Sequence, residues 1–257
     1  VSWGMKVGVK TNKRQIKYTV GLKGTLPCHV SIFTTPTASS EDKTIPPAIF
    51  SYKPPKENIV VFDRGVQSRK TFRELNDKNI QFVTRIKKDA VYKIISQNKI
   101  PLKSIDSTVT ISEDLIVQLR ETHKGKWNST KFRLVKAKSD ETGDELYFLT
   151  NIHDLDPYEI AFIYKKRWEI EVFFKFLKQE LNLSHIVSRN ENGVKVMIYM
   201  TLILSMLLLT YKKLNNLNGY KIPKMNFAKE IEIEVIRDIV VLCGGNPSKM
   251  PHIFSDT

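Results

Sequence analysis

One stretch of the chain, residues 156–182, carries polar residues whose types and spacing could do chemistry. If it forms one helix turning 100° per residue, four polar side chains fall within about 60° of one another. They are Tyr164, Arg167, Glu171 and Lys178. Such a line can hold a cation at the carboxylate and phosphates at the arginine and the lysine. The alternative is a solvated helix face whose charges pair with one another.

A second acid stands at the end of a short apolar run. The sequence NIVVF at residues 58–62 is typical of a central strand, and Asp63, Arg64 and Gly65 follow it directly. Function is common at the C-terminal tip of such a strand. Asp63 and Glu171 could therefore hold the divalent ions, Mg²⁺ or Mn²⁺, that support phosphoryl transfer. The alternative for Asp63 is a turn-forming aspartate before Gly65.

The order of these residues resembles a known family. Y-x2-R-x3-E-x6-K, within YKKRWEIEVFFKFLK, is similar to the signature of the insertion-sequence-four type of DDE transposases. FDRG after the apolar strand resembles their second-aspartate motif, and FVTR, ending in Arg85, resembles their next strand. The resemblance implies an RNase H-like α/β fold, a mixed sheet flanked by helices, with an inserted all-β subdomain between the second aspartate and the glutamate.

The resemblance also implies an activity, a metal and partners. Cut-and-paste DNA transposition would use Asp63 and Glu171 as catalytic metal ligands for Mg²⁺ or Mn²⁺. The partner would be double-stranded DNA, at transposon ends and at the target, with a homodimer in the DNA complex and no membrane. The expected location is the bacterial cytoplasm, in association with the nucleoid. The residues that would hold the DNA are Tyr164, Arg167, Lys178, Arg85 and Arg64.

The chain departs from the family pattern at the first catalytic aspartate. The first aspartate here, Asp42, lies in a stretch rich in Pro, Ser and Thr that follows two predicted strands, which is the wrong place for that acid. We therefore expect the first acid and the first core strand to lie upstream of Val1. Two interpretations remain open: an incomplete transposase, or a degenerate copy that binds DNA without cutting it.

Composition limits the partners. The 257 residues carry a formal charge of +14 and a pI near 9.6, which indicates an acidic partner, either nucleic acid or an anionic membrane surface. The two cysteines, Cys28 and Cys243, provide neither a metal cluster nor a disulfide framework, and we expect both to be small core residues. Residues 194–211 are apolar and about long enough to span a bilayer, yet Lys195, Thr201 and Ser205 interrupt them. We expect a buried helix there; the alternative is a membrane-associated basic protein.

The elements that must position the site follow from hydrophobic periodicity. Strands are predicted at 6–9, 15–22, 26–32, 58–62 and 80–86, and a helix at 68–79. Residues 36–55 read mostly as loop, with a short helix near Ala48. Short β runs are expected at 90–95, 108–112, 115–119, 131–137 and 146–149, with polar turns between them. A last helix at 228–243 follows a polar linker at 212–226. The predicted division is 1–86 for the first part of the core, 87–150 for the β subdomain, 151–215 for the second part of the core and 216–257 for the C-terminal helix and tail.

Overall fold

The computed structural model describes residues 5–6, 14–35, 38, 40–103, 107–121, 125, 127–185, 187–188 and 190–250. The chain forms two compact units, which are considered separately below. The first contains residues 1–24 and 28–172, and the second contains residues 25–27 and 173–257.

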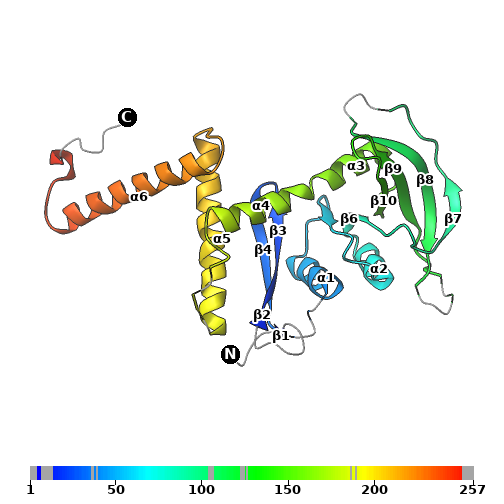
Figure 1. Ribbon diagram of the computed structural model, residues 1–257, viewed down its shortest axis with the longest axis horizontal. Helices are drawn as coiled ribbons and strands as arrows, with labels where there is room; N and C mark the ends of the chain where they lie inside the picture. Colours follow the sequence, from blue (N-terminus) through cyan, green and yellow to red (C-terminus); the bar gives the residue numbers. More distant parts are fainter. Residues whose placement is uncertain are drawn as a thin grey trace. The chain divides into compact units, whose positions relative to one another are not determined.

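The first unit is built on a six-stranded mixed sheet with the order β5-β6-β10-β9-β8-β7 (Figure 1). β5 and β6 are parallel, and every other neighbouring pair is antiparallel. The strands are β5 (Ile59–Phe62), β6 (Gln81–Arg85), β7 (Tyr92–Gln97), β8 (Val109–Leu119), β9 (Phe132–Ser139) and β10 (Glu145–Thr150). The predicted β segments between residues 87 and 150 thus continue the sheet of β5 and β6. The two runs expected at 108–112 and 115–119 form one strand, β8, with a register shift between Ile111 and Glu113.

Helices cover both faces of this sheet. On one face, α1 (Glu41–Tyr52) and α2 (Arg69–Asp77) pack over a core that includes Phe72 and Phe82. On the other face, α3 (Pro157–Lys165) buries Ile160 against strand residues that include Val83, Val135 and Phe148. This arrangement confirms the predicted class, a mixed sheet flanked by helices.

The N-terminal strands form two small sheets. β1 (Met5–Lys6) pairs with β2 (Arg14–Gln15), and β3 (Lys17–Lys23) pairs with β4 (Leu26–Phe33). The predicted strand 6–9 is described only at its start, since 7–10 lie outside the described residues. The expectation that Cys28 and Cys243 are core residues is wrong, because both are exposed. In β4 the neighbouring Pro27 takes the buried position beside Cys28.

The stretch 36–55 is less of a loop than its composition predicts. α1 occupies twelve residues of it, although Pro46 and Pro47 lie inside the helix. Each proline removes one backbone hydrogen bond, a cost that burial offsets. Pro46 and Ala48 are buried, and Ile45 and Ile49 pack against the core under α1 and α2.

The single helix predicted at 156–182 is interrupted. α3 ends at Lys165, and α4 (Trp168–Gln179) starts after a turn at Lys166 and Arg167. The backbone N–H groups of residues 166, 167, 169 and 170 each donate to the carbonyl three residues earlier. This tighter turn breaks the regular 100° progression. The prediction of one helix over 156–182 is therefore wrong, and the line of side chains from Tyr164 to Lys178 stays a prediction.

The second unit is helical. α5 (Glu191–Leu214) and α6 (Lys221–Leu242) are followed by the short 3-10 helix η2 (Pro247–Lys249). α6 begins seven residues before the predicted start because Pro223 falls in its first turn, where no backbone donor is needed. Among the described residues, α5 alone is long and apolar enough to cross a membrane by length and composition. Its inward stripe includes Ile198 and Leu208, but only 28% of its most apolar window is buried, less than expected of a core helix.

Candidate functional site

Strand alternation brings Asp63 and Arg85 to the face of the sheet that α3 covers. Ile59 and Val61 of β5 pack in the core beneath α3, and Asp63 continues that period of two. In β6, Val83 packs in the same core, and Arg85 follows it two residues later on the same face of the strand. The turn at Asp63 is fixed by the buried Thr84, whose hydroxyl donates to the carbonyl of Phe62 at 3.0 Å. The Asp63 carboxylate accepts the N–H of Arg64 at 2.7 Å.

Tyr164 connects the strand residues to the helix. It is buried in the last turn of α3, where its ring lies 5.3 Å from that of Phe148. The guanidinium of Arg85 lies 5.9 Å from the Tyr164 ring centroid, and that of Arg167 lies 5.7 Å from it. Contacts of this kind hold both cations near one aromatic ring. Burial raises the pKa of Tyr164, and the nearby Asp63 carboxylate raises it further, so the phenol remains protonated near neutral pH.

Arg167 joins Tyr164 to Glu171. Its Nη1 donates to Oε1 of Glu171 at 2.8 Å across one turn of backbone. Burial opposes the charge on Arg167, but the hydrogen bond to Glu171 and the charge of Asp63 raise its pKa. Arg167 therefore interacts electrostatically with both predicted metal-binding acids, Asp63 and Glu171, but it forms a hydrogen bond only with Glu171.

These side chains surround an open cleft of about 700 Å³. Five of the seven predicted site residues line it. The lining residues are Asp63, Arg64, Arg85, Lys88, Gly143, Asp144, Glu145, Leu146, Tyr164 and Arg167. Its cationic side chains suit an anion.

Several predicted site residues leave hydrogen-bonding capacity unused. Within the described part of the chain, four buried side-chain atoms have no hydrogen-bond partner. Three of them belong to predicted site residues: Nε of Arg85, Nε of Arg167 and Oε2 of Glu171. Buried polar atoms are nearly always paired with protein or with ordered water, so these three atoms are positions at which a ligand or a water molecule would complete the bonding.

The acids fit a divalent cation in part. Carboxylate oxygens are the donors that Mg²⁺ and Mn²⁺ prefer, and Oε2 of Glu171 is buried without a partner. Asp63 and Glu171 both lie close enough to Arg167 to raise its pKa. Over the described ranges, however, no group of three or more His, Cys, Asp or Glu side chains is placed to hold a metal ion. The donor set suits an ion that takes its remaining ligands from water or phosphate.

Asp42 has a structural role, because its carboxylate is hydrogen-bonded to the backbone. Its Oδ1 accepts the backbone N–H of Gln67 at 2.7 Å and that of Ser68 at 2.9 Å. Ser68 is the N-cap of α2, and its hydroxyl accepts the N–H of Thr71. Asp42 therefore ties α1 to the start of α2. This structural task agrees with the expectation that Asp42 does not supply the first acid.

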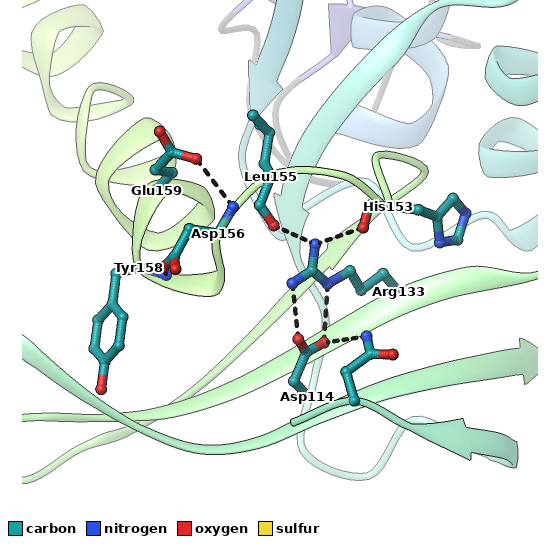
Figure 2. A network of polar contacts seen from close by, with 8 residues as sticks. Asp114, Arg133, His153, Leu155, Asp156, Tyr158 and Glu159 are labelled. Carbon is teal, nitrogen blue, oxygen red and sulfur yellow. Dashed lines mark hydrogen bonds and ion pairs between the residues drawn. The ribbon is translucent and has the colours of Figure 1, made fainter. Parts of the chain in front are cut away.

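A buried ion pair anchors the other end of α3 (Figure 2). Arg133 of β9 binds Asp114 of β8 through Nε at 2.9 Å and Nη2 at 2.7 Å. Its Nη1 donates to the carbonyls of His153 at 3.1 Å and Leu155 at 2.5 Å, in the loop that leads into α3. Asp156 then caps the helix in a capping box with Glu159. The pair thereby fixes where α3 begins, and Tyr164 follows two turns later.

Sequence patterns missed part of this assembly. Lys88 and the acids Asp144 and Glu145 line the cleft because β6 pairs with β10, a long-range contact with no local signal. A charged residue inside the apolar run FRLV was the available clue to Arg133. Lys178 is exposed and belongs to the second unit, so its contribution to the site stays a prediction.

A family model described as Transposase DDE domain matches residues 2–207, most of the chain. The chain belongs to this transposase DDE domain family. Membership implies polynucleotidyl transferase chemistry, which in this family generally uses divalent metals. The six-stranded sheet with its flanking helices is consistent with the RNase H-like core predicted for such a transposase.

Individual transposases show the same similarity. The chain is 27% identical over 183 residues to a Sinorhizobium fredii protein named "Putative transposase y4zB", covering 71% of this chain and 47% of that protein. It is 29% identical over 159 residues to a Synechocystis protein named "Putative transposase for insertion sequence element IS4SA", covering 60% of this chain and 41% of the relative. A Geobacillus stearothermophilus protein named "Probable transposase for insertion sequence element IS5377" is 28% identical over 153 residues, covering 59% and 39%. The chain thus spans less than half the length of these curated relatives.

Proposed function

We propose that this chain is part of a cut-and-paste DNA transposase and that the cleft beside Asp63 binds the DNA backbone at the element end. The observation that carries the proposal is the set of three buried, unpartnered polar atoms on Arg85, Arg167 and Glu171. They lie among residues that match the family's signature, in a chain of charge +14. A phosphodiester with its counter-cation would satisfy both the arginine donors and the carboxylate acceptor.

Each residue has a distinct task in this proposal. Arg64, Arg85 and Arg167 bind phosphate oxygens, and Lys178 extends the contact along the DNA. Tyr164 holds two of the guanidinium groups in place through its ring, and its hydroxyl stays protonated as a hydrogen-bond donor. Because these contacts are made to phosphates, they position the DNA and do not read its sequence.

Asp63 and Glu171 are the proposed ligands for Mg²⁺ or Mn²⁺. When bound, such an ion supplies activation of the attacking oxygen and charge stabilisation at the leaving oxygen. The chain's own contribution is to hold the two carboxylates on rigid elements, one at the end of β5 and one in α4, while Arg167 keeps Glu171 oriented. The further proposed partners are double-stranded DNA at element ends and target, and a second copy of the chain in the DNA complex. The bacterial nucleoid is the corresponding location.

Duplex DNA binding tests the proposal directly. The affinity should fall steeply as salt rises, with a slope of about 0.9 for each phosphate contact. Arg167→Ala should weaken binding about tenfold and make the slope shallower, because it removes a charged donor from the cleft. Fluorescence anisotropy over a series of salt concentrations measures both quantities. Affinity independent of salt, or unaffected by Arg167→Ala, contradicts the proposal.

The second candidate function is DNA binding without cleavage. It is favoured by one observation: in the described part of the chain no group of three or more His, Cys, Asp or Glu side chains is placed to hold a metal ion, and Asp42 is committed to α2. Fixing two ions normally requires more carboxylates than two. We therefore expect this chain alone to leave a supercoiled donor plasmid intact with Mg²⁺ and with Mn²⁺, and a chain extended upstream to cut it. Specific cutting at element ends by the present chain would rule out this candidate.

A further inference from the structure

The cleft contains a cation that the family signature does not include. Lys88 lies in the connection between β6 and β7, three residues beyond Arg85, and it lines the same cleft as Asp63 and Arg64. Its side chain is exposed, so it does not contribute to packing of the core. It is bound instead to an acid: Nζ of Lys88 lies 2.6 Å from Oε2 of Glu145.

Glu145 is held in place from a second side. It begins β10 and lines the cleft, and the hydroxyl of Tyr147 donates to the same Oε2 at 3.0 Å. The Tyr147 ring is itself held in the sheet, with the ammonium of Lys136 lying 5.8 Å from its centroid. β10 pairs with β6 through Phe148 and Arg85, which fixes the distance between the Glu145 and Lys88 segments.

Both members of the pair are charged at neutral pH. The hydrogen bond to Lys88 and that to Tyr147 lower the pKa of Glu145, and the hydrogen bond to and the charge of Glu145 raise the pKa of Lys88. A full negative charge is therefore fixed at the border of a cleft whose other charged side chains include three arginines. A phosphate entering the cleft meets both the attraction of Lys88 and the repulsion of Glu145.

We propose that Lys88 is a further phosphate-binding residue of this cleft and that Glu145 is its internal competitor. This inference rests on the proposed DNA-binding function. A phosphate oxygen replaces the Glu145 carboxylate on the Lys88 ammonium, while Tyr147 keeps Glu145 within the cleft wall. No covalent bond is made or broken in this exchange. Glu145 thus lowers the affinity for DNA, because each binding event must first separate its ion pair with Lys88.

Two single variants and their combination test the exchange, with a short mixed-sequence DNA duplex as the probe. Lys88→Ala should weaken binding about threefold and reduce the salt slope by about one contact. Glu145→Gln should strengthen binding about threefold, because Gln keeps the size and the Tyr147 contact but releases Lys88. In the double variant the gain from Glu145→Gln should largely disappear, since there is no Lys88 to release.

The chain offers a matched control pair. Lys103 and Asp140 form a similar exposed ion pair at 2.7 Å, and neither residue lines the cleft. Asp140 lies in the connection between β9 and β10, close in sequence to Glu145, the first residue of β10. Lys103→Ala and Asp140→Asn change the net charge by the same amounts, so any effect of overall charge appears in them equally.

The outcomes separate the inference from the function on which it rests. Equal effects of Glu145→Gln and Asp140→Asn, or a gain from Glu145→Gln that persists fully without Lys88, overturn the inference alone. Binding that depends on Arg167 but not on Lys88 does the same and leaves the proposed function standing. Failure of the unmodified chain to bind the duplex overturns both.

Discussion

Two arginine–carboxylate pairs lie at opposite ends of α3, and they differ in how completely they are bonded. Arg133 and Asp114, before the helix, are 4% and 1% exposed, and Arg133 uses Nε, Nη1 and Nη2. Arg167 and Glu171, after the helix, are 20% and 41% exposed and share one hydrogen bond. Buried Nε and Oε2 atoms remain unpartnered in the second pair, and neither Arg133 nor Asp114 has such an atom. The first pair is fully bonded within the fold, whereas the second keeps donor and acceptor capacity that a ligand could use.

This difference suggests different roles for the two pairs, stability for Arg133–Asp114 and ligand binding for Arg167–Glu171. A saturated buried pair contributes to a defined fold, because removing either partner leaves an uncompensated charge in the interior. A half-exposed pair contributes little to stability, since water screens it. The following predictions test whether stability and ligand binding divide between the two pairs in this way.

The largest expected effect is on stability, at Asp114. Asp114→Asn should lower the free energy of unfolding by about 3–5 kcal/mol, because it leaves the Arg133 charge buried without its counter-charge. Urea denaturation followed by circular dichroism measures the change. Replacing both partners by apolar residues, Asp114→Leu with Arg133→Met, should recover most of the loss. A loss below about 1 kcal/mol in the single variant would show that the pair is not a stabilising anchor.

The second effect is on metal binding, at Glu171. Glu171→Gln should weaken Mn²⁺ binding by more than about tenfold, since the site loses one of two carboxylates. The free energy of unfolding should change by less than about 1 kcal/mol because the pair with Arg167 is half-exposed. Calorimetric titration with Mn²⁺ gives the affinity.

Glu169→Gln is the matched control for Glu171. Glu169 lies in the same first turn of α4, and its carboxylate lies 3.9 Å from Nζ of Lys166. This variant should leave Mn²⁺ binding unchanged. If Glu171→Gln strongly lowers the free energy of unfolding and leaves the Mn²⁺ affinity unchanged, Glu171 has a structural role like that of Asp114. The two pairs would then no longer differ in function.

The contrast also explains which parts of the site the sequence predicts. The apolar run before Asp63 and the alternation through Val83 to Arg85 are local patterns, so the end of β5 was predicted correctly and that of β6 to within one residue. The capping box at Asp156 is likewise local, and it marks the start of α3. Tyr164, Arg167 and Glu171 follow at fixed spacing, so their proximity survives the interruption of the helix.

Features that depend on long-range contacts escaped prediction. The bonding of Arg133 to Asp114 requires the register of β8 and β9, and the ion pair of Lys88 with Glu145 requires β6 beside β10. α1 forms despite its two prolines because its other residues pack on the core. The local composition of residues 36–55 does not reveal this packing with distant residues, so it predicted mostly loop. The domain boundaries proposed from the sequence stay predictions.

Asp42 provides a smaller effect that extends the comparison to a third carboxylate. Asp42→Ala should lower the free energy of unfolding by about 1–2 kcal/mol, because two backbone N–H groups at the start of α2 lose their acceptor. Mn²⁺ affinity should not change, since this carboxylate is already bonded within the fold. Asp42→Asn keeps one acceptor oxygen and should lose less. A fall in Mn²⁺ affinity in either variant would instead make Asp42 part of the metal site.

The smallest expected effect separates charge from geometry at Arg167. Arg167→Lys keeps the positive charge but removes Nε and the planar fork, so it should weaken binding to duplex DNA about threefold with little change in stability. The salt slope should stay nearly constant, because the number of cations facing phosphates is the same. Arg73→Lys is the control, since Arg73 also pairs with a glutamate, Glu121, but does not line the cleft. If Arg167→Lys binds as tightly as the unmodified chain, the unpartnered Nε contributes nothing to the ligand. Arg167 would then act only as a point charge, and incomplete bonding would no longer distinguish the two ends of α3.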